Sequence, residues 1–385
     1  MVPASEPFDP RHFSRVRRPL PEASHLPAWC YTSDEFYRRE TERVFRKAWN
    51  FLGRADRIAK PGDYFTAEIA GVPLFVLRDR AGRLRAYANS CRHRGARLLS
   101  GDGHCTGSIT CPYHSWTYDL DGRLKSAPGM QGIKGFDPAG TPLIEVRLET
   151  WGGFIFVTFD PAAENLTSYL GTLPELLAPY DFERMICTRR KVYDVACNWK
   201  LITENSMEEY HTATVHRASI GAQTIEWERP VGNWEAGCCE SDKSIATLPG
   251  ETEALPWIPT LSGKSKTGTF FVLIYPCTTL ACNQDGAFWL ELYPRGSART
   301  EVVLGHCFPR STTERLDFEK IVQKYYGRCD TSIPEDNHIA EQQQLGLDSP
   351  LAQPGRVSMY EAVVHSFANW IIDRVLDDRP AIASG

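Results

Sequence analysis

The chain has 385 residues, enough for one large domain or two domains, and an ordinary globular composition of 42% hydrophobic and 24% charged residues. Its net charge of −5 gives no support for nucleic-acid binding. Residues 1–26 are polar and lack the apolar core of a secretory signal, and no stretch has the apolar length of a membrane span. We therefore expect a cytoplasmic protein whose twelve cysteines are reduced thiols.

Residues 43–160 read as short strands separated by turns. Gly-Asp and Ala-Gly pairs alternate with stretches rich in β-branched and aromatic residues, a pattern typical of a small antiparallel domain. An apolar run consistent with a buried strand closes the region. The predicted strands are 64–69, 72–77, 84–88 and 151–159.

Two Cys/His pairs lie inside this region. Cys91 and His93 form the first pair, and Cys111 and His114 form the second after seventeen intervening residues. In a Rieske [2Fe–2S] cluster two thiolates hold one iron and two imidazoles hold the other, which raises the reduction potential. The spacing therefore predicts a Rieske cluster held by two loops, and a protein that handles electrons one at a time.

A structural zinc ion also binds two Cys and two His. The flanking residues favour the iron–sulfur cluster, because both loops contain small or hydroxyl residues that can donate hydrogen bonds to cluster sulfurs. His104 and Cys105, between the loops, are interpreted as ordinary loop residues. Five further cysteines are interpreted as small buried hydrophobes: Cys238, Cys239, Cys277, Cys282 and Cys307.

From residue 161 onward, helical and strand patterns are mixed. Residues 363–372 include an apolar stripe with helical spacing, typical of a helix packed on a core. The region is therefore predicted to be α+β, with an antiparallel sheet flanked by helices. The predicted strands are 189–196, 270–275, 287–293 and 300–308, and the predicted helices are 166–180, 199–211, 316–326, 335–345 and 360–376.

The segment 198–216 combines two histidines with several acids. Glu204, Glu208 and His211 are spaced i, i+4, i+7, so a helix would place them on one face. His216 does not continue this face, and the β-branched residues before it predict that the helix ends between the two histidines. Both imidazoles could then converge on one metal ion.

Two His and one carboxylate form the facial triad of non-haem Fe(II) oxygenases, which leaves coordination positions open for O₂ and substrate. We choose Asp336 as the carboxylate and Glu335 as the alternative, although an acid at the start of a helix can also serve the helix dipole. A Rieske electron carrier without this second iron and a zinc-stabilised binding module remain as alternative interpretations.

Together these motifs resemble the α (oxygenase) subunit of Rieske non-haem iron oxygenases over nearly the whole chain. The resemblance implies an N-terminal segment (1–42) packed on the catalytic domain, an antiparallel β Rieske [2Fe–2S] domain (43–160) and a helix-grip catalytic domain (161–385). It also implies Fe(II) bound by His211, His216 and Asp336. The matching motifs are C-x-H-x17-C-x2-H from Cys91 to His114, N-W-K-x3-E-N-x2-E-x-Y-H-x4-H from Asn198 to His216, and E-D-x4-E-x2-Q-x-G-L from Glu335 to Leu347.

In this family electrons cross between neighbouring subunits of a trimer, through an acid that links a Rieske histidine to an iron histidine. Glu208 occupies that position, where most members have Asp. The additional methylene implies either a slightly different geometry or a role shared with Glu204 or Glu209. A carboxylate suits the position because it can accept N–H bonds from imidazoles on both sides.

The resemblance also implies partners. A separate reductase delivers electrons from NAD(P)H, directly or through a ferredoxin, and O₂ and a small molecule are the substrates. The chain has no G-x-G-x-x-G between a strand and a helix, so we expect no bound flavin or NAD. We expect a homotrimer.

The Glu335–Leu347 motif, the later Gly355-Arg356-x-Ser358 and Glu361 look most like the branch that acts on quaternary ammonium compounds. A trimethylammonium group favours aromatic ring faces. The alternative is an aromatic-ring hydroxylating oxygenase acting on an aromatic acid, for which Arg217 or Arg229 could bind the carboxylate. Candidate cage residues are Trp227, Trp234, Trp257, Phe270, Phe271, Tyr275, Phe288, Trp289 and Tyr293.

Overall fold

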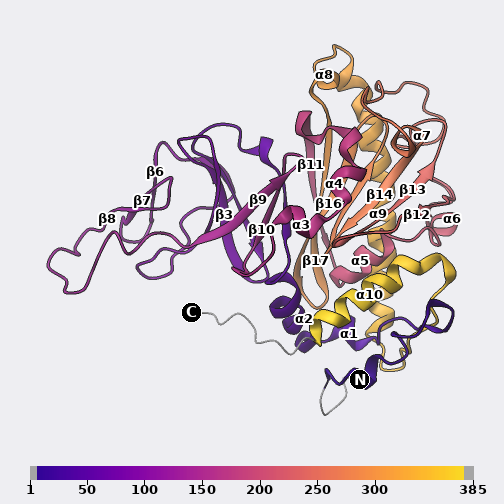
Figure 1. Ribbon diagram of the computed structural model, residues 1–385, viewed down its shortest axis with the longest axis horizontal. Helices are drawn as coiled ribbons and strands as arrows, with labels where there is room; N and C mark the ends of the chain where they lie inside the picture. The colour runs from indigo at the N-terminus through magenta and orange to yellow at the C-terminus, as the bar shows by residue number, and fades with distance from the viewer. Residues whose placement is uncertain (1–6, 377–385) are drawn as a thin grey trace. The chain divides into compact units, whose positions relative to one another are not determined.

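The computed structural model describes residues 7–376 of the chain (Figure 1). The chain divides into two compact units. Lys47–Leu166 forms one of them, and the chain before it joins the chain after it to form the other. Each unit is built around its own antiparallel sheet.

The smaller unit contains a seven-stranded sheet in the order β1-β10-β9-β4-β3-β2-β5 and a three-stranded sheet β6-β7-β8. One hydrophobic cluster includes residues of both sheets and the two motif cysteines, Cys91 and Cys111. The predicted strands of this region are confirmed. The strands are β1 (Asn50–Arg54), β2 (Asp63–Ile69), β3 (Val72–Arg78), β4 (Leu84–Ala88), β5 (Asp102–His104), β6 (Ser108–Thr110), β7 (Thr117–Asp119), β8 (Leu124–Ser126), β9 (Glu145–Trp151) and β10 (Phe154–Thr158).

The larger unit is built on a second seven-stranded sheet, in the order β11-β17-β16-β15-β14-β13-β12. The four predicted strands are confirmed, whereas β12, β13 and β15 were not predicted. All five residues of β15 are buried, so the sequence lacks the alternation of polar and apolar residues that marks a half-exposed strand. The strands are β11 (Met185–Val195), β12 (Glu226–Trp227), β13 (Trp234–Glu240), β14 (Gly268–Ile274), β15 (Thr278–Cys282), β16 (Ala287–Gly296) and β17 (Arg299–Pro309).

Short helices, among them α1 (Trp29–Thr32), α2 (Asp34–Glu40), α3 (Leu166–Leu170) and α4 (Leu173–Leu176), accompany three main helices. The prediction of one helix over 166–180 is wrong, because Gly171 follows α3 with a φ of 55°. The main helices are α5 (Trp199–Asn205), α9 (Phe318–Leu347) and α10 (Ala362–Val375); the other short helices are α6 (Thr212–Val215), α7 (Lys264–Thr267) and α8 (Arg310–Thr313).

Helix α9 corrects a second prediction. The sequence suggested two helices separated near Pro334, but the structure has one helix of 30 residues with Pro334 inside it. Proline removes one backbone hydrogen bond from a helix interior. Buried side chains precede and follow the proline, from Phe318 to Gln344, and their packing holds the helix together across the missing bond.

Two helices of the N-terminal segment pack within the larger unit, where α1 contacts α9 and α2 contacts α10 (Figure 1). Lys200 on α5 donates to Glu40 on α2 at 2.7 Å, and both side chains are fully buried. The indole N–H of Trp199 also donates to Glu40, at 3.2 Å. A fully buried ion pair of this kind fixes α2 against α5, because either charge alone would be left without a partner in the core.

No helix in residues 7–376 is long and apolar enough to cross a membrane. All twelve cysteines lie in the described part of the chain as free thiols. The five cysteines interpreted as buried hydrophobes are confirmed as buried, each at most 7% exposed. His104 lies on β5 and pairs with Asp63, at 2.8 Å.

Two candidate metal centres

The two loops that carry the Cys/His pairs have the same backbone design. The N–H of Cys91 bonds to the carbonyl of the residue five positions later, as does the N–H of Cys111. Gly95 and Ser115, each four positions after the cysteine, donate their N–H back to the cysteine carbonyl and have positive φ angles of 75° and 59°. The chain therefore folds each pair into a tight turn that presents its side chains on one side.

The side chains in these loops fit a two-iron cluster. Cys91 and Cys111 are buried free thiols, and the His93 and His114 rings lie 4.7 Å apart. Nδ1 of each histidine is buried and has no hydrogen-bond partner among the described residues, so both nitrogens are available to bind a metal. Trp116 stacks on His93 with a centroid distance of 4.9 Å and holds the ring in place.

A single zinc ion fits these four side chains less well. Ligand atoms on one tetrahedral ion lie within about 4 Å of one another. Within residues 7–376, one group of three possible metal ligands has its ligand atoms within 4.8 Å of one another. That group lies elsewhere in the chain and does not include the Cys/His pairs. The Cys/His pairs do not form such a group, as expected for ligands that are divided between two irons.

Tyr118 supplies a hydroxyl to the first loop. Its oxygen accepts the Arg92 N–H at 3.1 Å and lies 3.4 Å from Sγ of Cys91. Because the hydroxyl oxygen already accepts a bond, its proton is free to point at the sulfur. Such a bond stabilises negative charge on a thiolate and tunes the potential of a cluster.

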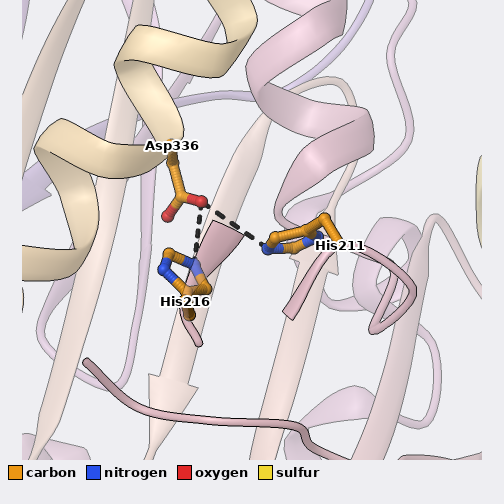
Figure 2. A group of neighbouring side chains, drawn as sticks. All are labelled: His211, His216 and Asp336. Atoms are coloured by element: carbon orange, nitrogen blue, oxygen red, sulfur yellow. Dashed lines mark ion pairs between the residues drawn. The ribbon is translucent and has the colours of Figure 1, made fainter. Parts of the chain in front are cut away.

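The second centre brings together His211, His216 and Asp336 (Figure 2). Oδ1 of Asp336 lies 2.9 Å from Nε2 of His216 and 3.5 Å from Nε2 of His211. The same oxygen is buried and has no hydrogen-bond partner among the described residues. Three ligand atoms that converge in this way fit the facial triad of a mononuclear iron.

The other nitrogen of each histidine faces a carboxylate. Nδ1 of His211 lies 2.6 Å from Glu208, and Nδ1 of His216 lies 2.7 Å from Glu335. Ser219 donates to the same Glu335 oxygen at 2.6 Å. Since a carboxylate accepts, each Nδ1 carries the proton and each Nε2 presents its lone pair towards Asp336. Glu335, the alternative ligand, thus contacts the outer side of His216.

The predicted helix over residues 199–211 is confirmed only in its first part. Helix α5 ends at Asn205 and α6 begins at Thr212, so both histidines lie outside α5 and the three predicted residues do not share a helical face. Glu204 instead accepts a hydrogen bond from Tyr31 at 2.8 Å, and burial raises its pKa to about 7. Of the three acids that could act at this position, Glu208 is the one that contacts His211.

A cavity of about 80 Å³ lies beside the second centre. Helix α9, strands β14, β15 and β16 and the segment from residue 205 to 225 line it. Most of its lining is apolar, as in many small-molecule sites. Among its lining residues are Glu208, His211, His216, Ile220, Ile225, Phe271, Leu280, Phe288, Leu290, Arg328, Ser332 and Asp336.

Few of the residues suggested as pocket residues line this cavity. Of the nine aromatic candidates, only Phe271 and Phe288 do so. Arg217 and Arg229 are exposed and do not line it, whereas the buried Arg328 does. Sequence reasoning missed Arg328, which is eight residues before Asp336. The spacing would place both on one helical face, but only if the helix continues through Pro334.

Family models match both units. The model of the Rieske [2Fe–2S] domain matches residues 48–137, and that of the ring hydroxylating alpha subunit (catalytic domain) matches residues 182–377. These matches identify the chain as an oxidoreductase of the Rieske non-haem iron oxygenase type, which carries a [2Fe–2S] cluster and a mononuclear iron. Oxygenase subunits of this family receive electrons from a reductase and act on small substrates.

Three similar curated proteins are monooxygenases or their oxygenase subunits, and each matches this chain over most of its length. The carnitine monooxygenase oxygenase subunit of Escherichia coli (strain K12) is 31% identical over 341 residues, covering 85% of each chain. The glycine betaine monooxygenase oxygenase subunit of Pseudomonas aeruginosa (strain UCBPP-PA14) is 27% identical, covering 92% of this chain and 89% of the relative. Chloroplastic choline monooxygenase of Beta vulgaris is 28% identical, covering 92% and 77%.

Solved structures show the same fold. The quaternary ammonium Rieske monooxygenase CntA in complex with γ-butyrobetaine is 25% identical, with a TM-score of 0.77 over 91% of this chain and 95% of that one. Naphthalene 1,2-dioxygenase from Rhodococcus sp. has a TM-score of 0.78 at 20% identity, covering 92% and 95%, and shows the fold alone. The chain therefore belongs to the ring-hydroxylating alpha-subunit family of Rieske non-haem iron oxygenases.

Proposed function

We propose that the chain is the terminal oxygenase component of a monooxygenase that hydroxylates a quaternary ammonium compound, followed by C–N cleavage or N-demethylation. O₂ and electrons from a separate NAD(P)H-dependent reductase, directly or through a ferredoxin, are the co-substrates. The observation that carries this proposal is the convergence of His211, His216 and Asp336 beside a mostly apolar cavity. The carnitine, glycine betaine and choline monooxygenases among its relatives support the substrate class.

The roles of the site residues follow from their positions. Cys91, Cys111 and Nδ1 of His93 and His114 would hold the cluster, and His211, His216 and Asp336 would hold the iron. When bound, the cluster would supply single electrons and the iron would supply a site for O₂ activation. Glu208 and Glu335 hold the two iron histidines in the tautomer that leaves Nε2 free.

The cavity can hold a cation without N–H groups. Phe271 and Phe288 contribute aromatic rings to the lining of the cavity, and Glu208 contributes a carboxylate. Ring faces and carboxylates both attract a trimethylammonium group, which has no proton to donate. Apolar side chains on the remaining wall suit its methyl groups and exclude water.

The assembly belongs to the same proposal. A homotrimer would let the cluster of one subunit serve the iron of the next, with Glu208 as the connecting acid. His93 and His114 are only partly buried although their Nδ1 atoms are not exposed, so each ring has an outer edge available to a partner. Mass measurement of the native protein in solution tests the trimer.

The activity is tested with the iron-loaded protein, a compatible reductase and NAD(P)H. Oxygen uptake is measured with trimethylammonium compounds and with aromatic acids, and the products are identified by mass spectrometry. We expect uptake with release of trimethylamine or an aldehyde. Ring hydroxylation without turnover of any quaternary amine would move the protein to the aromatic branch.

A matched variant keeps the metal assignment separate from the substrate assignment. His211→Ala should lose the mononuclear iron, about one third of the total, and keep the coloured cluster. Oxygen uptake should then stop with every substrate. Retention of all the iron in this variant would show that His211 is not a ligand.

A further inference from the structure

We propose that Arg328 binds a carboxylate of the substrate, so that the cavity selects quaternary ammonium compounds that also carry an anionic group. The inference deepens the proposed function and rests on it for the location of the reacting carbon. Arg328 is 4% exposed and lines the cavity beside the candidate iron ligands.

Arg328 differs from the other buried cations. Arg54 and Lys200 are buried to a similar extent, and each has a carboxylate partner, at 2.9 Å and 2.7 Å. Within residues 7–376, no carboxylate oxygen lies within 4.0 Å of the guanidinium nitrogens of Arg328, so it forms no ion pair. Its Nε has no hydrogen-bond partner. Because a guanidinium remains charged in proteins, the buried charge needs an anion that the chain itself does not supply.

The nearest contacts do not replace that anion. The guanidinium carbon lies 5.7 Å from the ring centroid of Phe288, a contact that leaves the in-plane N–H donors unused. His306, a buried neighbour, has a lowered pKa, mainly through burial and further through the charges of Arg189 and Arg328. The side chain of Asp330 is already bonded to Arg189 and Lys191. Apart from the thiol of the adjacent Cys329, which is a weak partner, no described side chain bonds to the guanidinium of Arg328, and its Nε is unpaired.

Two of the charged groups that line the cavity are separated along helix α9. Arg328, Ser332 and Asp336 all line it and are spaced four residues apart on α9, so they lie along one helical face. Eight residues of helix separate the Cα atoms of Arg328 and Asp336 by ~12 Å. The carboxylate of Glu208 thus lies at the metal site, where a bound iron would offset the charge of Asp336, and the positive charge of Arg328 lies about two helical turns from Asp336.

A zwitterion matches this arrangement. Its trimethylammonium group would lie towards Glu208 and Phe271, and its carboxylate would accept N–H bonds from the guanidinium of Arg328, which lies beside Phe288. A cationic alcohol such as choline would leave Arg328 without an anion. An aromatic acid would satisfy Arg328 but would place no cation beside the carboxylates.

The test measures binding and turnover in the holoenzyme with matched compounds. Glycine betaine, carnitine and choline form the ammonium arm, and benzoate forms the aromatic arm. Dissociation constants are measured by calorimetry without O₂, and KM and kcat by oxygen uptake. For Arg328→Met we expect the dissociation constant of the carboxylate-bearing ammonium compounds to rise on the order of 10²-fold, with choline nearly unchanged. Arg328→Lys should recover part of the loss, and the exposed Arg229→Met should change nothing.

Wild-type protein provides a second measurement that does not depend on the folding of a variant. The methyl ester of glycine betaine keeps the cation and removes the negative charge, so it should bind much more weakly than glycine betaine. Equal affinity for acid and ester would overturn the proposal, as would equal losses for choline and glycine betaine in Arg328→Met. Binding of benzoate that depends on Arg328, without turnover of any ammonium compound, would overturn the proposed function and leave the carboxylate site standing. Turnover of choline alone, unaffected by substitution of Arg328, would overturn the carboxylate site and leave the proposed function standing.

Discussion

Glu208 contacts His211 through both of its carboxylate oxygens. Oε1 lies 2.6 Å from Nδ1 of the ring, and Oε2 accepts the backbone N–H of the same residue at 3.0 Å. Both residues also line two cavities of the larger unit, the one beside the metal site and a second of about 280 Å³ that includes Tyr31 and Glu204. Glu208 therefore holds His211, a proposed iron ligand, while it lines both cavities.

The charge of Glu208 can be removed with little change of shape. In Glu208→Gln the amide oxygen can still accept the ring N–H, so we expect both metal centres to remain filled. The amide is neutral and cannot respond to the charge of a cluster, so coupled turnover should fall by about 10- to 100-fold or more. Stopped-flow reoxidation of the reduced cluster in the presence of substrate and O₂ measures the loss. Glu209→Gln is the neighbouring control, and normal turnover in Glu208→Gln would remove Glu208 from electron transfer.

Glu335 is expected to act on iron affinity through His216. Glu335→Ala removes the acceptor of the Nδ1–H and the shorter of the two hydrogen bonds of the Ser219 hydroxyl, which also donates to the His216 carbonyl at 3.3 Å. Loss of such a supporting carboxylate typically weakens metal binding by about 10- to 100-fold. Iron retained per chain after dialysis against a chelator checks this, with the cluster absorbance as an internal reference. Glu335→Gln keeps an acceptor and should recover most of the affinity; if the alanine variant holds iron as tightly as wild type, Glu335 has no such role.

The ion pair between Lys200 and Glu40 predicts a large effect on stability. Lys200→Met leaves Glu40 buried without its cation and should cost about 3–5 kcal/mol of unfolding free energy. The double variant with Glu40→Gln removes both charges and should be more stable than Lys200→Met alone. Thermal unfolding of the iron-loaded proteins compares them, and additive losses in the double variant would contradict the coupling.

Glu235 predicts a dependence of stability on pH. Burial raises the pKa of Glu235 from 4.5 to about 7, and the hydrogen bond from Tyr275 opposes this in part. Its contribution to stability is thus fully present below about pH 4.5 and is lost as the pH rises through 7. The glutamine in Glu235→Gln cannot ionise. The unfolding free energy of this variant relative to wild type should therefore increase by on the order of 2 kcal/mol from pH 5 to pH 8. Unfolding temperatures at the two pH values measure this, with the exposed Glu314→Gln as a control that should show no such gain.

Local sequence was sufficient wherever the ligands lie close together in the chain. Cys91 with His93 and Cys111 with His114 are each carried by one tight turn, and His211 and His216 flank the short helix α6, so these candidate ligands could be named from the sequence once the motifs were considered together. Four strands of the smaller unit, β2, β3, β4 and β10, were also predicted, because glycines mark their turns, whereas β1 and β5 to β9 were not.

Elements whose stability comes from distant packing were predicted less well. Helix α9 is continuous through Pro334 because buried residues on both sides pack against the larger unit, which the local pattern of a proline does not show. Helix α5 ends early although its sequence has helical composition. The error at Pro334 also concealed that Arg328 and Asp336 lie along one face.

The sequence by itself thus determined the family, the two kinds of metal centre and the α+β architecture, because these depend on residue types at short spacing. Only the tertiary structure decided which groups surround those centres. Glu335 bonds to His216, which is 119 positions away, and Glu204 bonds to Tyr31, which is 173 positions away. Arg328 lines the same cavity as Asp336. The physical reason is that such contacts arise when the sheet and helices pack, and their partners cannot be identified from local propensity or periodicity.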